Sequence, residues 1–173
     1  MYYDVYALSS KRDATTVENF LSHFCDRSLL EPVVDRWIHV SANEKYHTPE
    51  VDIPLHFIAE LIAYAVANLN HAFNYYTDEG IRDNIDCVII QFTYDGKVVF
   101  GISVGCTQDA GGDNIAQAIQ VEAEIRQVTG AYKSYIAGEY PPARDEEQFD
   151  TDVAMWKELR DSFEQDHTGK VIS

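Results

Sequence analysis

Hydrophobic residues near the start of the chain predict a strand, a helix and a second strand. The segment from Tyr2 to Leu8 is aromatic and β-branched with partial alternation, which favours a strand. Asp13, Thr15 and Thr16 offer N-caps for a helix. The segment from Val34 to Ser41 predicts the second strand. The apolar residues of the helix recur at helical spacing: Val17, Phe20, Leu21 and Phe24.

The next part of the chain predicts a long helix at the centre of the core. Asn43 to Asp52 is polar and contains a proline, so a loop is expected there. Pro54 suits the first turn of a helix, where its missing N–H costs little, and the helix should run to about Tyr76. More than one apolar stripe indicates that most of its circumference is buried. These apolar residues are Phe57, Ile58, Leu61, Ile62, Ala65, Val66, Leu69 and Phe73.

Two segments rich in Val, Ile and Phe, from Asp86 to Tyr94 and from Lys97 to Cys106, predict a β-hairpin. They flank Asp95-Gly96, a dipeptide typical of tight primed turns. Such turns need positive φ, which Asp tolerates and Gly adopts freely. A glycine-bearing loop from Thr107 to Gly112 follows the hairpin.

The last third of the chain predicts two helices with a short strand between them. The first helix should run from Asp113 to about Val128, with Gly130 ending it. Ala131 to Ala137 is the candidate strand, and the last helix should run from about Glu146 to Glu164. Residues 166–173 are expected to fray. The last helix should turn inward Phe149, Val153, Trp156, Leu159 and Phe163.

This order of elements predicts an α+β fold. A mostly antiparallel sheet of about five strands, with the 86–106 hairpin at its centre, should pack against about four helices. We find no internal repeat, low-complexity tract or linker in the sequence, so residues 1–173 are expected to form a single globular domain.

The cysteines and the apolar segments indicate a cytoplasmic protein. Cys25, Cys87 and Cys106 are widely spaced and form no CxxC pair, which disfavours disulfide-rich and zinc-ribbon classes. The first residues lack a basic region followed by an apolar one, as a secretory signal would have. The apolar stretch from Ile53 to Val66 is too short to span a bilayer.

The net charge limits the possible partners. The chain has 29 acidic and 13 basic residues, for a formal net charge of -16. Nucleic acids and anionic membranes are bound by clustered Lys and Arg, so we expect neither as a partner. The charge instead favours a basic protein as a partner.

Two groups of residues suggest chemistry, but each has a simpler structural explanation. The loop from Thr107 to Asp113 matches no phosphate-binding motif, and its acids repel phosphate. Together with Asn114, these acids supply only some of the oxygen ligands that a cation site needs. No metal or cofactor is therefore expected. His56 and Glu60 lie four residues apart and, on one helix face, could act as acid and base. A buried or half-buried hydrogen-bonded pair without catalysis is the favoured interpretation.

Tyrosines and C-terminal acids suggest a binding surface. The chain has 11 tyrosines, many near the predicted ends of elements, and tyrosine is enriched at protein interfaces. From Glu139 to Lys170 the sequence has ten acids against four bases. Both observations also have structural explanations. The tyrosines could form the rim of the core with their hydroxyls in water, and the acids could lie on a solvated helix face or suit the helix dipole.

In size, acidity and α+β order, with Asp86 to Cys106 as sheet core, the chain resembles small acidic bacterial immunity proteins. These proteins inhibit the toxins, many of them cationic nucleases, of polymorphic-toxin and contact-inhibition systems. The resemblance implies a non-catalytic protein that neutralises a basic toxin by stoichiometric binding and occludes its active site. The candidate partner-binding residues are Tyr140, Asp145, Glu146, Glu147, Asp150 and Asp152.

Two other hypotheses remain open at this point. The chain could be an enzyme or a small-ligand-binding protein that uses a cleft near His56, Glu60 and the loop from Thr107 to Asp113. Its acidity could also be a solubility adaptation, as in salt-loving organisms. The sequence does not fix the oligomeric state.

Overall fold

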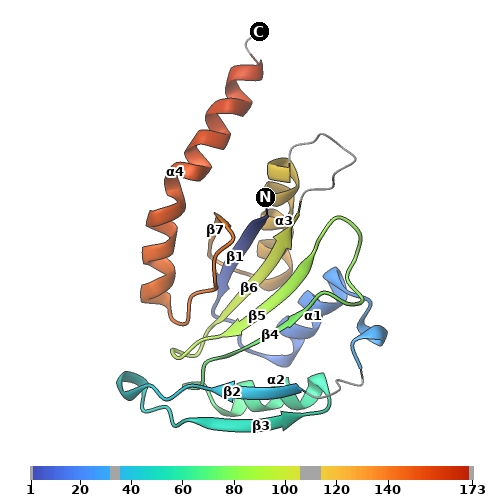
Figure 1. The fold of residues 1–173 in the computed structure, drawn as a ribbon, viewed down its shortest axis with the longest axis vertical. Helices are drawn as coiled ribbons and strands as arrows, with labels where there is room; N and C mark the ends of the chain where they lie inside the picture. The colour runs from blue at the N-terminus through green and yellow to red at the C-terminus, as the bar shows by residue number, and fades with distance from the viewer. Residues whose placement is uncertain (1, 32–35, 106–113, 172–173) are drawn as a thin grey trace.

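A five-stranded antiparallel sheet forms the centre of the molecule (Figure 1). The computed structural model describes residues 2–31, 36–105 and 114–171. In the sheet the strands are ordered β4-β5-β6-β1-β7, and each neighbouring pair is antiparallel. The strands are β1 (Tyr3–Ser9), β4 (Phe73–Thr77), β5 (Cys87–Phe92), β6 (Val98–Val104) and β7 (Lys133–Gly138).

A smaller sheet and four α-helices complete the described structure. The smaller sheet pairs β2 (Arg36–Val40) with β3 (Val51–Leu55). The helices are α1 (Ala14–Phe24), α2 (Ile58–Ala67), α3 (Asn114–Thr129) and α4 (Glu146–Val171). Two short 3₁₀ helices cover Arg27–Leu29 and Glu44–Tyr46. This confirms the predicted α+β class, with its five-stranded antiparallel sheet and four helices.

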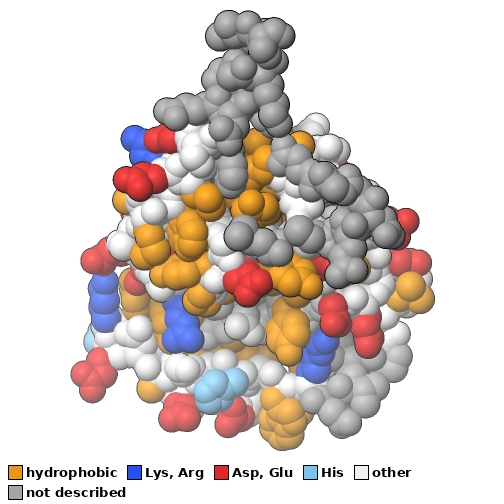
Figure 2. Space-filling model, turned by 45° about the horizontal axis from the view of Figure 1, so that its top comes forward, with side chains coloured by type: hydrophobic (Ala, Val, Ile, Leu, Met, Phe, Trp, Pro, Cys, Tyr) orange, Lys and Arg blue, Asp and Glu red, His pale blue; other side chains and the backbone are white. Residues whose placement is uncertain are grey.

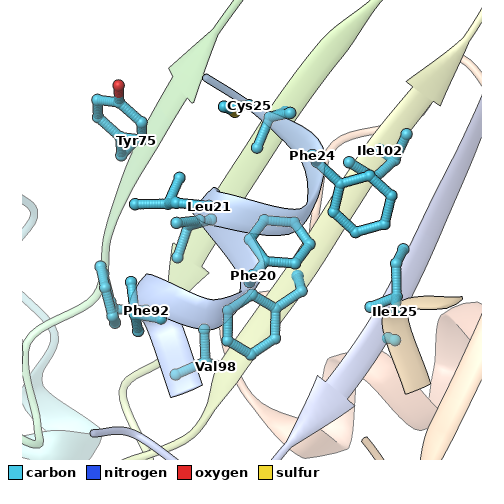
Figure 3. Packing of buried hydrophobic residues seen from close by; sticks show 14 of the residues in the cluster. Phe20, Leu21, Phe24, Cys25, Tyr75, Phe92, Val98, Ile102 and Ile125 are labelled. Atoms are coloured by element: carbon cyan, nitrogen blue, oxygen red, sulfur yellow. The ribbon is translucent and has the colours of Figure 1, made fainter. Parts of the chain in front are cut away.

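The two faces of the large sheet carry different clusters of buried residues. Alternation along β1 turns Val5 and Ala7 toward α1 and α3, where the larger cluster lies. In that cluster the rings of Phe20 and Phe24 of α1 lie 5.2 Å apart (Figure 3). Tyr6 and Leu8, on the opposite face of β1, belong to a second cluster beneath α4. Because α4 packs beside β7, it leaves part of this second face uncovered (Figure 1).

The predicted helix from Pro54 to Tyr76 is wrong. Pro54 lies in β3 opposite Trp37, α2 covers only Ile58–Ala67, and the chain then turns into β4. The residues of β4 alternate between buried and exposed, a period that also suits a strand. Long-range pairing of β4 with β5 outweighs the local helical pattern.

The hairpin is confirmed, but its predicted turn is not. The Thr93 N–H donates to the Lys97 carbonyl over 3.0 Å, which leaves a three-residue loop instead of a tight two-residue turn. In this loop only Gly96 has positive φ, at 80°. Asp95 instead uses its carboxylate, which accepts hydrogen bonds from the Thr93 hydroxyl and the Glu146 N–H.

The last helix begins at Glu146 as predicted but continues to Val171, beyond its expected end near Glu164. Phe149 is fully buried on its inner face, and Val153 and Trp156 are half-buried against the same cluster. Gly130 ends α3 with φ of 65°, as expected. None of the helices in the described parts of the chain is both long and apolar enough to cross a membrane.

A buried arginine connects three parts of the fold. The Arg12 side chain, in a residue only 7% exposed, donates hydrogen bonds to five backbone carbonyls. The acceptors are Ala65, Asn68, His71, Thr93 and Lys97, at distances of 2.7 to 3.4 Å. Burial lowers the pKa of Arg12 to about 10, so it remains charged at neutral pH. The guanidinium thus joins the end of α2, the turn before β4 and the β5–β6 loop.

Replacing this guanidinium should destabilise the fold. We expect Arg12→Met to lower the free energy of unfolding by roughly 3–5 kcal/mol, because buried carbonyls lose a charged donor. Urea denaturation measures the change. The control is Lys11→Met, which removes the same charge from the exposed neighbouring residue and should cost less than about 0.5 kcal/mol. Equal losses in the two variants would contradict the structural role of Arg12.

Candidate functional site

The acids predicted to bind a partner cluster at the start of α4, where they fasten this helix to the sheet. Glu146 forms ion pairs with Lys97 and Lys133, and it accepts a hydrogen bond from the Tyr132 hydroxyl. The Lys133 ammonium also lies 2.6 Å from the Asp150 carboxylate. These lysines come from the β5–β6 loop and from β7, so all three ion pairs hold α4 against the large sheet.

The neighbouring acids of this turn also have partners within the chain. The Glu147 carboxylate lies 2.9 Å from the Lys45 ammonium, in an exposed pair. The Asp145 carboxylate caps α4 by accepting from the Gln148 N–H, and it accepts from the Tyr46 hydroxyl over 2.8 Å. The start of α4 is therefore also tied to the 3₁₀ helix before β3.

The remaining two candidates lie between α4 and the sheet. Asp152, only 2% exposed, accepts hydrogen bonds from the Tyr135 and Tyr140 hydroxyls. Burial raises the pKa of Asp152, although both hydrogen bonds oppose this shift. The Tyr140 ring packs edge-on against Trp156, with ring centres 5.6 Å apart. The structure thus brings all six candidates to one region, but as contacts that dock α4.

The residues of the alternative cleft are not brought together in the same way. His56 lies in the segment before α2, so it does not share a helix face with Glu60 as predicted. Both side chains are exposed, and neither lines the two cavities described below. The loop from Thr107 to Asp113 lies outside the described residues. Within the described residues, no group of three or more His, Cys, Asp or Glu side chains is arranged to hold a metal ion.

A cavity of about 380 Å³ opens on the part of the sheet face that α4 leaves uncovered. Figure 2 shows one face of the molecule, where hydrophobic side chains are interspersed with Asp, Glu, Lys and Arg. No Lys or Arg is among the described residues that line the cavity. We call this cavity the acidic pocket, and its lining consists of Tyr2, Asp4, Tyr76, Asp78, Asp86, Cys87, Ser103 and Glu139.

Strand register and one glycine build the floor of the acidic pocket. Asp4 of β1 pairs with Ser103 of β6, and the Ser103 hydroxyl donates to the Asp4 carboxylate over 2.6 Å. Next to this pair, the Gly105 N–H donates to the Asp86 carboxylate. A side chain at Gly105 would collide with that carboxylate and with the Tyr2 ring, so only glycine permits this close approach.

The electrostatic environment of the acidic pocket suits binding better than nucleophilic catalysis. Burial raises the pKa of Asp4, and the nearby Glu139 adds to the shift, whereas hydrogen bonds from Ser103 and the Tyr140 N–H oppose it. Burial also raises the pKa of the Cys87 thiol, and the charges of Asp78 and Asp4 raise it further. The thiol therefore stays protonated at neutral pH and is a poor nucleophile.

A second cavity, of about 260 Å³, lies between the two sheets. Tyr76 lines both cavities, so the second begins where the acidic pocket ends. We call it the aromatic groove, and its lining consists of Arg36, Trp37, Ile38, Leu55, Leu61, Asn74, Tyr75 and Tyr76.

Sequence reasoning missed both cavities, although part of the signal was present. Alternation along β1 places Asp4 on the same face as Tyr6, opposite the core residues Val5 and Ala7. A carboxylate on an otherwise buried strand is costly unless it has hydrogen-bond partners, so it indicates a polar site within the sheet. The convergence of Asp4 with residues from four other segments depends on the strand order, which no local pattern specifies.

Comparison of the chain with protein-family models, with curated proteins and with solved structures found no match. The geometry of the two cavities and of the α4 contacts is therefore what bears on function.

The buried Asp152 should produce a measurable pH dependence of stability. Its pKa is higher in the folded protein than its ordinary value of 3.8, so the folded state retains the proton to higher pH than the unfolded state. Asp152 therefore lowers the free energy of unfolding as pH rises from 3.8 through the raised pKa. Asp152→Asn should lack this decrease when urea unfolding is measured from pH 3.5 to 7.

The matched control for this experiment is Asp161→Asn, which removes an exposed carboxylate from the same helix. Asp4 is retained in both variants, so its own pH dependence cancels in the comparison. If the two variants follow the same pH dependence as each other, Asp152 is not the source of the decrease.

Proposed function

We propose that the chain is a non-catalytic immunity-type protein that neutralises a basic toxin by stoichiometric binding through the acidic pocket. The acids at the start of α4 are the less suitable surface, since they already have cationic or hydroxyl partners within the chain. A partner could recruit them only by displacing those contacts.

The observation that supports this proposal is the group of uncompensated carboxylates in the acidic pocket. Asp78 and Glu139 are exposed at its rim, and within the described residues neither has a hydrogen bond or ion pair. Tyr2, 47% exposed, and Tyr76, 60% exposed, add aromatic surface beside them. Lys and Arg side chains interact favourably with both carboxylates and aromatic faces.

The proposed mechanism is electrostatic steering followed by occlusion. The net charge of -16 attracts a cationic protein from a distance and accelerates encounter. The acidic pocket then accepts basic side chains that the toxin uses to bind its own anionic substrate. Covering these side chains blocks the toxin without any reaction in the inhibitor, so one copy inactivates one toxin molecule.

The first test is rescue from the product of a toxin-like reading frame immediately upstream of the gene. Co-expression of the wild-type chain should restore growth, and the purified proteins should form a one-to-one complex. The association rate constant should fall by roughly tenfold or more between 50 and 500 mM NaCl, because salt screens the attraction. Cytochrome c, an unrelated basic protein, serves as the partner control.

The acidic pocket is tested with Asp78→Asn/Glu139→Gln, whose exposed positions should tolerate the change. This double variant should associate several-fold more slowly and with a weaker salt dependence. Glu158→Gln/Asp161→Asn on α4 changes the net charge equally and should have a smaller effect. Absence of both growth rescue and a complex at 50 mM NaCl would contradict the proposed function. Equal effects of the two double variants would contradict the assignment of the pocket.

A further inference from the structure

Two large aromatic side chains lie exposed beside the acidic pocket. Trp37 is 64% exposed on β2, and Tyr76 is 60% exposed on β4. Both line the aromatic groove between the two sheets. Trp, Tyr and Arg are the residues that most often contribute large binding energies at protein interfaces, and all three types occur here.

Contacts with Arg36 hold the aromatic groove in shape. The Arg36 guanidinium lies 5.1 Å from the ring centre of Tyr75 and 5.5 Å from that of Tyr76. It also donates a hydrogen bond to the Tyr76 carbonyl and so links β2 to the edge strand β4. A ring that is already held in place loses little conformational entropy on binding, which favours affinity.

We propose that the aromatic groove is the second half of the toxin-binding surface and receives an apolar side chain of the same cationic protein. This inference rests on the proposed function. Since Tyr76 lines both cavities, one docked protein can fill the acidic pocket with a basic side chain and the groove with a neighbouring apolar one.

The exposed aromatic rings of the groove favour an apolar occupant. Ile38, Leu55 and Leu61 are buried core residues, each at most 3% exposed, so the exposed rings of Trp37 and Tyr76 supply the apolar surface that an occupant can reach. Among the described residues that line it, the only charged one is Arg36, which repels a second basic side chain. A second copy of this chain is disfavoured as the occupant, because two copies with net charges of -16 repel each other.

The two cavities should therefore affect binding kinetics differently. Exposed carboxylates act mainly through long-range attraction, so their removal slows association. Aromatic anchors act after contact is made, so their removal accelerates dissociation. This difference separates the role of the groove from that of the acidic pocket within one set of measurements.

The test measures both rate constants for the complex between the chain and the upstream toxin-like protein. Trp37→Ala and Tyr76→Ala should each increase the dissociation rate constant by roughly tenfold or more, with little change in the salt dependence of association. Phe57→Ala removes a half-exposed aromatic ring that lines neither cavity and should change dissociation less than twofold. Circular dichroism melting establishes that each variant folds.

The outcomes distinguish this inference from the proposed function. If the wild-type complex forms and the chain rescues growth, but Trp37→Ala and Tyr76→Ala dissociate like Phe57→Ala, the groove is not part of the interface and the function stands. If no complex forms with the wild type, the proposed function itself fails. Wild-type dimers at micromolar concentration in sedimentation, lost in Trp37→Ala, would assign the groove to a second copy and overturn the inference.

Discussion

The joining of α2, the turn before β4 and the β5–β6 loop depends on a buried cation, Arg12, in a strongly acidic chain. Arg12 satisfies carbonyls from the end of α2, from the turn that follows it and from the β5–β6 loop. A buried guanidinium is stable only when its donors have acceptors, so these segments must remain together. The turn held in this way leads directly into β4. That strand carries Tyr76 to the sheet edge, where the acidic pocket and the aromatic groove meet.

The acidic residues of the chain serve two different purposes. At the start of α4 they are structural, because Glu146 and Asp150 hold the helix to Lys97 and Lys133. At the acidic pocket, Asp78 and Glu139 have no such partners within the described residues. Net charge therefore does not locate a binding surface. The distribution of the few lysines decides which acids are neutralised within the molecule and which ones face outward.

In the proposed function the two cavities would combine long-range and short-range recognition. Carboxylates at the acidic pocket would set the direction and rate of encounter with a cationic protein. Aromatic rings in the groove would add contact area that an unrelated basic protein would not match. This combination gives a physical reason why the proposed inhibitor would recognise one basic partner among many.

The sequence by itself determined the α+β class, the 86–106 hairpin, the start of α4 and the glycine that ends α3, because these depend on local periodicity, turn residues and caps. It could not determine the end of α2 or the existence of β4, since distant contacts with Arg12 and β5 decide both. The candidate site followed the same division. Composition indicated an acidic surface with tyrosines, but only the strand order brought Asp4 and Tyr76 to the same pocket, and only the positions of the lysines showed that the α4 acids are already paired.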